Sequence, residues 1–142
     1  MAQYVVLIYE SESDYANAAP EVYGQIMDAH NRFAEKVIDR GGKIAGGNAL
    51  QGTDTATSIR GDVVTDGPFV ETKEMIGGYA IFELRNKEEA MAAAREFMQL
   101  HLDHMPGWEG TCEVRMMASP EAANARCRAS GVEVMGGRLM LD

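Results

Sequence analysis

The chain has 142 residues, of which 46% are hydrophobic and 25% are charged, and this length and composition predict one globular domain. Its formal net charge of -9 argues against a surface that binds duplex nucleic acid or an anionic membrane, because both require clustered Lys and Arg. No apolar run approaches the ~18 residues of a membrane span, and no signal peptide precedes the first expected strand, so we expect a cytoplasmic protein.

The chain begins with a strand, a helix and a second strand. Residues 3–9 form an apolar run that predicts a buried strand, and the polar residues 10–19 predict a loop. Pro20 suits the first turn of a helix, apolar residues recur after it at helical spacing, and Gly41-Gly42 ends the pattern. We therefore expect a helix over residues 20–40.

The remaining elements repeat this order after an inserted hairpin. Gly61 joins two short β-rich segments, and Asn86 with Glu89 three residues later is typical of a helix start. The expected elements are a strand over 43–50, short strands over 57–60 and 62–65, a strand over 77–84, a helix over 87–102, a strand over 111–117, a short helix from about 119 and a terminal hairpin over 132–141.

Two strand–helix–strand units in series predict a ferredoxin-like α+β fold, in which two helices cover one face of an antiparallel sheet. The other face would be bare, and several strand residues that point to it are apolar. Because an exposed apolar sheet face is usually buried between subunits, we expect a homodimer of the dimeric α/β-barrel type. We assign residues 1–118 to this domain and residues 119–142 to a C-terminal extension that packs on the domain or on the dimer partner.

The segment DGPFVETKE, from Asp66 to Glu74, carries an unusual density of polar residues. Asp66-Gly67-Pro68 predicts a turn, since Asp accepts hydrogen bonds from nearby amides, Gly adopts positive φ and Pro fixes φ. The polar residues from Glu71 to Glu74 exceed what a compact turn between two strands requires. They are therefore candidates for a site, and the alternative is a simple chain reversal after the hairpin.

The three histidines are the other candidates. His30 falls on the apolar face of the first helix, where burial lowers the pKa of an imidazole and an adjacent carboxylate raises it, a combination that can poise the ring for proton transfer. The alternative is a core histidine. His101 and His104 lie one helical turn apart and could share a metal, but without a third ligand in the sequence we expect neither a metal nor a cofactor.

The DGPFVETKE segment, followed by Gly77-Gly78-Tyr79, resembles the hallmark of the DGPF branch of the YCII-related proteins. The resemblance covers about residues 3–117. Its other parts are Tyr4-Val5-Val6-Leu7-Ile8-Tyr9, His30-Asn31-Arg32-Phe33, Leu100-His101, Pro106-Gly107-Trp108-Glu109-Gly110 and Glu113-Val114-Arg115.

This resemblance implies a dimeric ferredoxin-like fold with a cleft near the sheet and the first helix. Wider YCII-related proteins are thought to use a His–Asp pair there, and one relative acts as a lactone dehalogenase. The DGPF branch has no established activity, and its genes often lie beside those of extracytoplasmic-function sigma factors. These features imply either a small-molecule site or an accessory role.

We expect His30 to act as a general acid or base, with Asp66 as its partner, because a carboxylate in a glycine-proline turn needs little reorganisation. Asp103 is the alternative carboxylate. The residues expected to position a small anionic or carbonyl metabolite are Thr72, Lys73 and His101. The alternative function is a non-catalytic dimeric accessory or regulatory module of a sigma-factor system, without direct contact to nucleic acid.

Overall fold

The computed structural model describes residues 1–131, and the hairpin predicted over 132–141 lies outside them. In chain order the elements are β1 (Ala2–Glu10), α1 (Glu12–Ala16), α2 (Pro20–Asp39), β2 (Lys43–Ala49), the 3-10 turn η1 (Thr53–Thr55), β3 (Thr57–Arg60), β4 (Val63–Asp66), β5 (Met75–Leu84), α3 (Lys87–His104), β6 (Gly110–Met116) and α4 (Pro120–Ala129).

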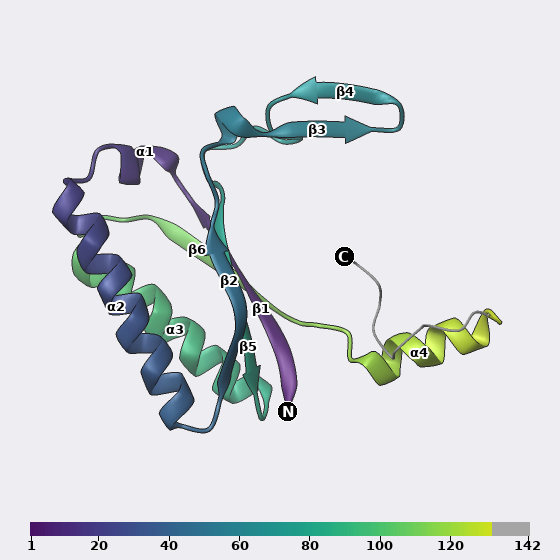
Figure 1. The fold of residues 1–142 in the computed structure, drawn as a ribbon. Coiled ribbons are helices and arrows are strands. Elements are labelled where there is room, and N and C mark those ends of the chain that lie inside the picture. Colours follow the sequence, from purple (N-terminus) through teal and green to yellow (C-terminus); the bar gives the residue numbers. More distant parts are fainter. Residues whose placement is uncertain (132–142) are drawn as a thin grey trace.

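Helices α2 and α3 lie on one face of a four-stranded sheet, and α4 lies on the other side (Figure 1). The strand order is β2-β5-β1-β6, and each neighbouring pair is antiparallel. This order places β5 and β1 at the centre and fits a ferredoxin-like arrangement, so the predicted α+β fold with two helices on one face is confirmed. Within residues 1–131, no helix is both long and apolar enough to cross a membrane.

The core lies between the sheet and its two helices, because every second side chain of a strand points toward the helices. Tyr4, Val6 and Ile8 of β1 are buried on the helix side, whereas Val5 and Leu7 between them are half-buried on the opposite side. The helices complete the same core with Ile26, Phe33, Val37, Ala90, Ala94 and Phe97. Burying each large apolar side chain stabilises the fold by about 1.5–3 kcal/mol.

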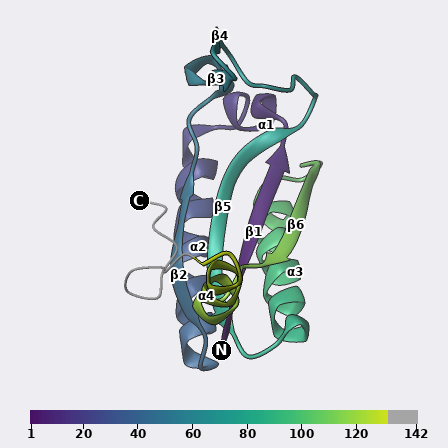
Figure 2. The same cartoon turned by 90° about the vertical axis from the view of Figure 1, so that its right-hand side faces the viewer.

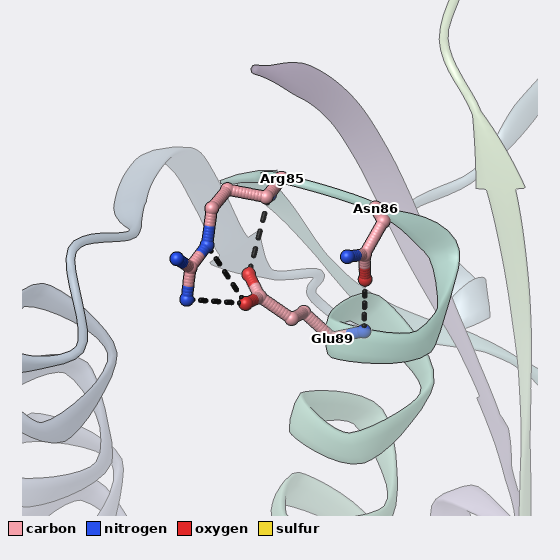
Figure 3. Close-up of polar contacts among 3 residues, drawn as sticks. All are labelled: Arg85, Asn86 and Glu89. Atoms are coloured by element: carbon pink, nitrogen blue, oxygen red, sulfur yellow. Dashed lines mark hydrogen bonds and ion pairs between the residues drawn. The ribbon is translucent and has the colours of Figure 1, made fainter.

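The start of α3 follows the prediction made from Asn86. The Oδ1 atom of Asn86 accepts a hydrogen bond from the backbone N–H of Glu89 at 2.9 Å, as an N-cap does (Figure 3). The Glu89 carboxylate does not return to Asn86, as it would in a capping box. It accepts instead from the backbone N–H and the guanidinium of Arg85 (Figure 3).

One region differs from the predicted pattern, and the predicted hairpin stands apart from the main sheet. The expected loop over residues 10–19 contains the short helix α1, and β1 continues to Glu10, which is buried on the helix side. The β3–β4 hairpin forms a separate two-stranded sheet that projects from one end of the main sheet, away from α2 and α3 (Figures 1 and 2).

Candidate functional site

A cavity of about 450 Å³ lies between α2 and the strands β1, β2 and β5. Its walls are largely apolar, and its size falls within the range of small-ligand sites. The ionisable side chains on its helix-side walls are Glu10, Tyr15, His30 and His101. A smaller cavity of about 230 Å³ shares Glu10, Tyr15 and His30 with it, so the two form adjoining parts of one hollow.

His30 and His101 bring α2 and α3 together at this cavity. Their Nε2 atoms lie 3.3 Å apart. The Nδ1 atom of His101 lies 2.8 Å from the carbonyl oxygen of Phe97, which can only accept, so this nitrogen carries the proton and Nε2 of neutral His101 is an acceptor. His30 therefore donates from Nε2 to His101, and its own Nδ1 is left as an acceptor.

Both rings of this pair are held neutral. Burial, together with the smaller effects of the nearby His101 and His104, lowers the pKa of His30 from 6.5 to about 4. Burial also lowers the pKa of His101, which is only 2% exposed. At neutral pH the pair consequently acts through hydrogen bonds and not as a cation.

Trp108 connects this pair to a buried carboxyl group. Its indole ring stacks on His101, with ring centroids 4.8 Å apart and planes inclined by 19°. Its Nε1–H donates a hydrogen bond to Oε2 of Glu10 at 3.2 Å. Glu10, Trp108, His101 and His30 thus form a continuous chain of contacts from β1 across the helix layer to α2.

Glu10 is poised to exchange a proton near neutral pH. Its side chain is 8% exposed, and burial raises its pKa from 4.5 to about 7. Hydrogen bonds from Trp108 and Tyr15 oppose this shift, while Asp14 adds to it. Burial, and to a smaller extent the contact with Glu10, raises the pKa of Tyr15. A group whose pKa lies near the working pH is suited to general acid–base chemistry.

Glycines at two strand positions provide the space for Glu10 and Trp108. A Cβ atom at Gly77 would lie 2.1 Å from Oε1 of Glu10, and one at Gly110 would lie 2.2 Å from the ring of Trp108. Gly77 is also the extra residue of a β-bulge between β5 and β1. Because bulges redirect side chains beside functional sites, Gly77 helps to set the position of the carboxyl group.

The structure places Asp66 outside this cavity. Asp66 is exposed at the end of β4 and pairs with Thr57 of β3. The turn after it is held by Gly67, whose N–H donates to the carbonyl oxygen of Ala56 at 2.8 Å and whose carbonyl oxygen accepts from Ser58 at 2.7 Å. The carboxyl group that shares the cavity with His30 is that of Glu10.

Thr72 and Lys73 also lie apart from His30. They line a separate surface hollow with Tyr9 and Thr111, strand residues that alternate with the helix-facing positions. Lys73 forms an exposed ion pair with Glu109 at 3.2 Å. Among the predicted site residues, the structure therefore brings together His30 and His101 only.

The predicted alternatives at the end of α3 have local partners. Oδ1 of Asp103 accepts a hydrogen bond from Gln99 at 2.9 Å, and Nδ1 of His104 lies 2.9 Å from the carbonyl oxygen of Leu100. His101 points to the cavity and Trp108, while His104 lines other surface hollows. Within residues 1–131, no three His, Cys, Asp or Glu side chains are grouped so that they could hold a metal ion.

Glu10 is the residue that sequence reasoning missed. The alternation of core-facing and outward-facing residues along β1 could have identified it. Residues 4, 6 and 8 face the core, and position 10 continues that series. An acidic residue at a core-facing position is uncommon unless it is paired or functional. Because polar residues follow it, Glu10 was assigned to the predicted loop and not to the end of the strand.

Residues 2–99 match the profile of the YCII-related domain. An uncharacterised protein of Rhizobium meliloti (strain 1021) is 29% identical over 119 residues, which covers 81% of this chain and 91% of that protein.

Proposed function

The chain belongs to the YCII-related family, and we propose that its cavity binds a small carbonyl or anionic metabolite and exchanges a proton with it. One observation carries this proposal: Glu10 and His30, whose pKa values are shifted in opposite directions, line the same cavity. Pairs of groups whose environments separate their pKa values in this way are typical of acid–base sites.

Glu10 is the proton-exchanging group in this proposal. When protonated it can donate to a ligand carbonyl oxygen, and when ionised it can accept a proton from a carbon or oxygen atom of the ligand. Hydrogen bonds from Trp108 and Tyr15 stabilise the carboxylate that remains after proton transfer. Release and uptake of the proton are therefore nearly balanced at neutral pH.

His30 contributes a neutral acceptor at the cavity wall. Since its Nε2–H is donated to His101, the lone pair on Nδ1 is available to accept a hydrogen bond or a proton. His101 is buried and acts through His30, so we propose that it is a positioning residue. This refines the predicted substrate-binding role of His101.

A thermal-shift screen of small metabolites tests the proposal. Wild type is compared with His30→Asn and Glu10→Gln, and we expect stabilising ligands whose affinity falls at least about tenfold in either variant. Equal shifts in all three proteins for every ligand would contradict the proposal. Asp66→Asn and Lys73→Ala in the same screen test the predicted roles of these residues, which stay predictions.

We also propose that the chain forms a homodimer through the bare face of its sheet. Leu7 pairs with Tyr79 and Val5 with Ile81 on this face, opposite the helix layer. These side chains are only half-buried or exposed, and Tyr79 is 37% exposed. A second subunit would remove this apolar surface from water.

Three finer assignments rest on the sequence. We propose that the chain belongs to the DGPF branch, that it acts in the cytoplasm, and that residues 1–118 form the functional domain. The DGPFVETKE segment supports the first assignment, and the contiguous sheet and helices within residues 1–118 support the third.

A second candidate is a non-catalytic accessory module beside a sigma factor, and the β3–β4 hairpin favours it. Ile59 and Val64 lie opposite each other in this hairpin and are 72% and 62% exposed. An isolated two-stranded hairpin is marginally stable, so a partner that covers these side chains would stabilise it. A sigma-factor transcription reporter that responds to Ile59→Ser with Val64→Ser, but not to His30→Asn, would support this candidate.

A further inference from the structure

Among the described residues, no basic side chain lines the cavity. None of the described residues that line its larger or its smaller part is Lys or Arg. The basic residues of α2 point elsewhere, because Arg32 pairs with Asp28, and Lys36 and Arg40 pair with Glu96. Their side chains are 60–63% exposed. A ligand in the cavity therefore meets no permanent positive charge from these walls.

The other ionisable groups do not supply a positive charge either. His30 has a pKa of about 4 and is neutral under physiological conditions. Glu12 lines the smaller part and accepts hydrogen bonds from the backbone N–H and the hydroxyl of Thr53, at 2.6 and 3.0 Å, as a carboxylate would. An anion moved from water into these surroundings loses hydration without gaining a cationic partner, which costs several kcal/mol.

An uncharged ligand finds better partners. The carboxyl group of Glu10 can donate a hydrogen bond, and Asn31 of α2, whose side chain carries an amide, lines the same cavity. Ile8 and Phe82 provide apolar walls on the sheet side. This combination matches a compound with one polar carbonyl group on an apolar body.

We infer that the cavity selects uncharged carbonyl compounds, such as amides, esters or ketones with an apolar ring, over carboxylates of the same shape, and that Glu10 sets this selectivity. The inference rests on the proposed function and narrows its ligand class. Protonated Glu10 donates to a carbonyl oxygen, and ionised Glu10 repels a carboxylate. Both protonation states of Glu10 therefore favour the uncharged carbonyl compound over the carboxylate.

Isothermal titration with 2-naphthamide and 2-naphthoate at pH 7 and low salt tests this selectivity, since the two probes match in shape and differ in charge. We expect wild type to bind 2-naphthamide at least about tenfold more tightly. Glu10→Gln retains the shape of the side chain and removes its charge, and it should lower this ratio at least about threefold by removing the repulsion of 2-naphthoate.

Ala34→Phe tests whether the probes bind in this cavity. The larger side chain fills the cavity from α2 and should weaken the binding of both probes. Circular dichroism verifies that each variant is folded. Equal or tighter binding of 2-naphthoate by wild type would overturn the inferred selectivity, and an unchanged ratio in Glu10→Gln would overturn the role of Glu10. Failure of both probes to bind, or binding that Ala34→Phe leaves unchanged, would instead contradict the proposed function and the inference with it.

Discussion

The Nε2 atoms of His30 and His101 lie 3.3 Å apart, so the two rings share one proton along the line between them. The carbonyl oxygen of Phe97 fixes the proton of His101 on Nδ1, and this determines the direction of the shared hydrogen bond. Protonating both rings would place two charges side by side in a buried site. The pair is therefore a neutral, oriented unit that presents Nδ1 of His30 as an acceptor.

Removing His101 should raise the pKa of His30. In His101→Phe an aromatic ring beside Trp108 is retained, but the charge repulsion from the second imidazole is lost, so the pKa of His30 moves toward its ordinary value. Burial is the largest cause of the lowered pKa of His30, and it persists in this variant, so part of the shift remains. His104→Asn is the matched control and should move the pKa less, since His104 contributes less to the shift. NMR titration of the imidazole resonances measures the pKa of His30 in both variants. An equal change in the two would contradict the pairing of His30 with His101.

The pH dependence of stability should reveal two opposing contributions. Glu10 has a folded-state pKa of about 7, raised from 4.5, so its contribution is complete below pH 4.5 and is lost as pH rises through 7. His30 has a folded-state pKa of about 4, lowered from 6.5, so its contribution is complete above pH 6.5 and is lost as pH falls through 4. Between pH 5 and 7 the two largely cancel in the wild type.

Single variants should remove this cancellation. From pH 5 to pH 7, the unfolding free energy of Glu10→Gln should rise relative to wild type by about 2 kcal/mol, and that of His30→Asn should fall by about 2 kcal/mol. Urea unfolding at the two pH values measures the difference. Parallel pH profiles for wild type and both variants would show that neither pKa is shifted as described.

Substituting Gly77 should disturb the position of Glu10. In Gly77→Ala the new Cβ would lie 2.1 Å from Oε1 of Glu10, so the carboxyl group must leave its place beside Trp108, and we expect a loss of about 1–3 kcal/mol. Gly24→Ala on α2 is the control, because nothing lies within 4 Å of its Cβ and alanine favours a helix by about 1 kcal/mol. Urea unfolding gives the stability, and Trp108, the only tryptophan, reports the local change by fluorescence. A Gly77→Ala protein as stable as Gly24→Ala would argue against this steric role.

A charge on the bare sheet face should dissociate the proposed homodimer. Leu7→Glu places a carboxylate at the centre of this face, next to Tyr79, where a second subunit would bury it. Ile38→Glu is the control, because Ile38 is 58% exposed near the end of α2 and lies outside this face. Light scattering after gel filtration should find a dimer for wild type and Ile38→Glu and a monomer for Leu7→Glu. A monomeric wild type would contradict the dimer proposal.

Local sequence patterns were sufficient to predict the sheet and its two helices. Pro20 and Gly41-Gly42 bound α2 as expected, and Asn86 caps α3, because these signals act within a few residues of the chain. The site was less accessible to prediction. His30 was found from its place on an apolar helix face, but its partner comes from α3, 71 residues later, and only the packing of the two helices brings them together.

Sequence reasoning favoured Asp66 over Glu10 for a related reason. Asp66 lies in a rigid turn with a distinctive sequence, whereas Glu10 is a single acidic residue at the end of a strand. Its significance depends on Trp108 and on the space left by Gly77, which belong to distant segments. The DGPFVETKE segment identifies relatives more readily than it identifies the cavity.

The central claim is that a neutral His30 and a Glu10 titrating near neutrality share one cavity. A pH titration of the chain's three histidines and its single indole N–H by NMR tests it most directly. We predict that the Trp108 indole resonance shifts with a midpoint of about pH 7, as Glu10 ionises, and that His30 does not protonate until about pH 4. An indole resonance that is insensitive to pH between 5 and 8, together with a His30 midpoint near 6.5, would contradict the claim.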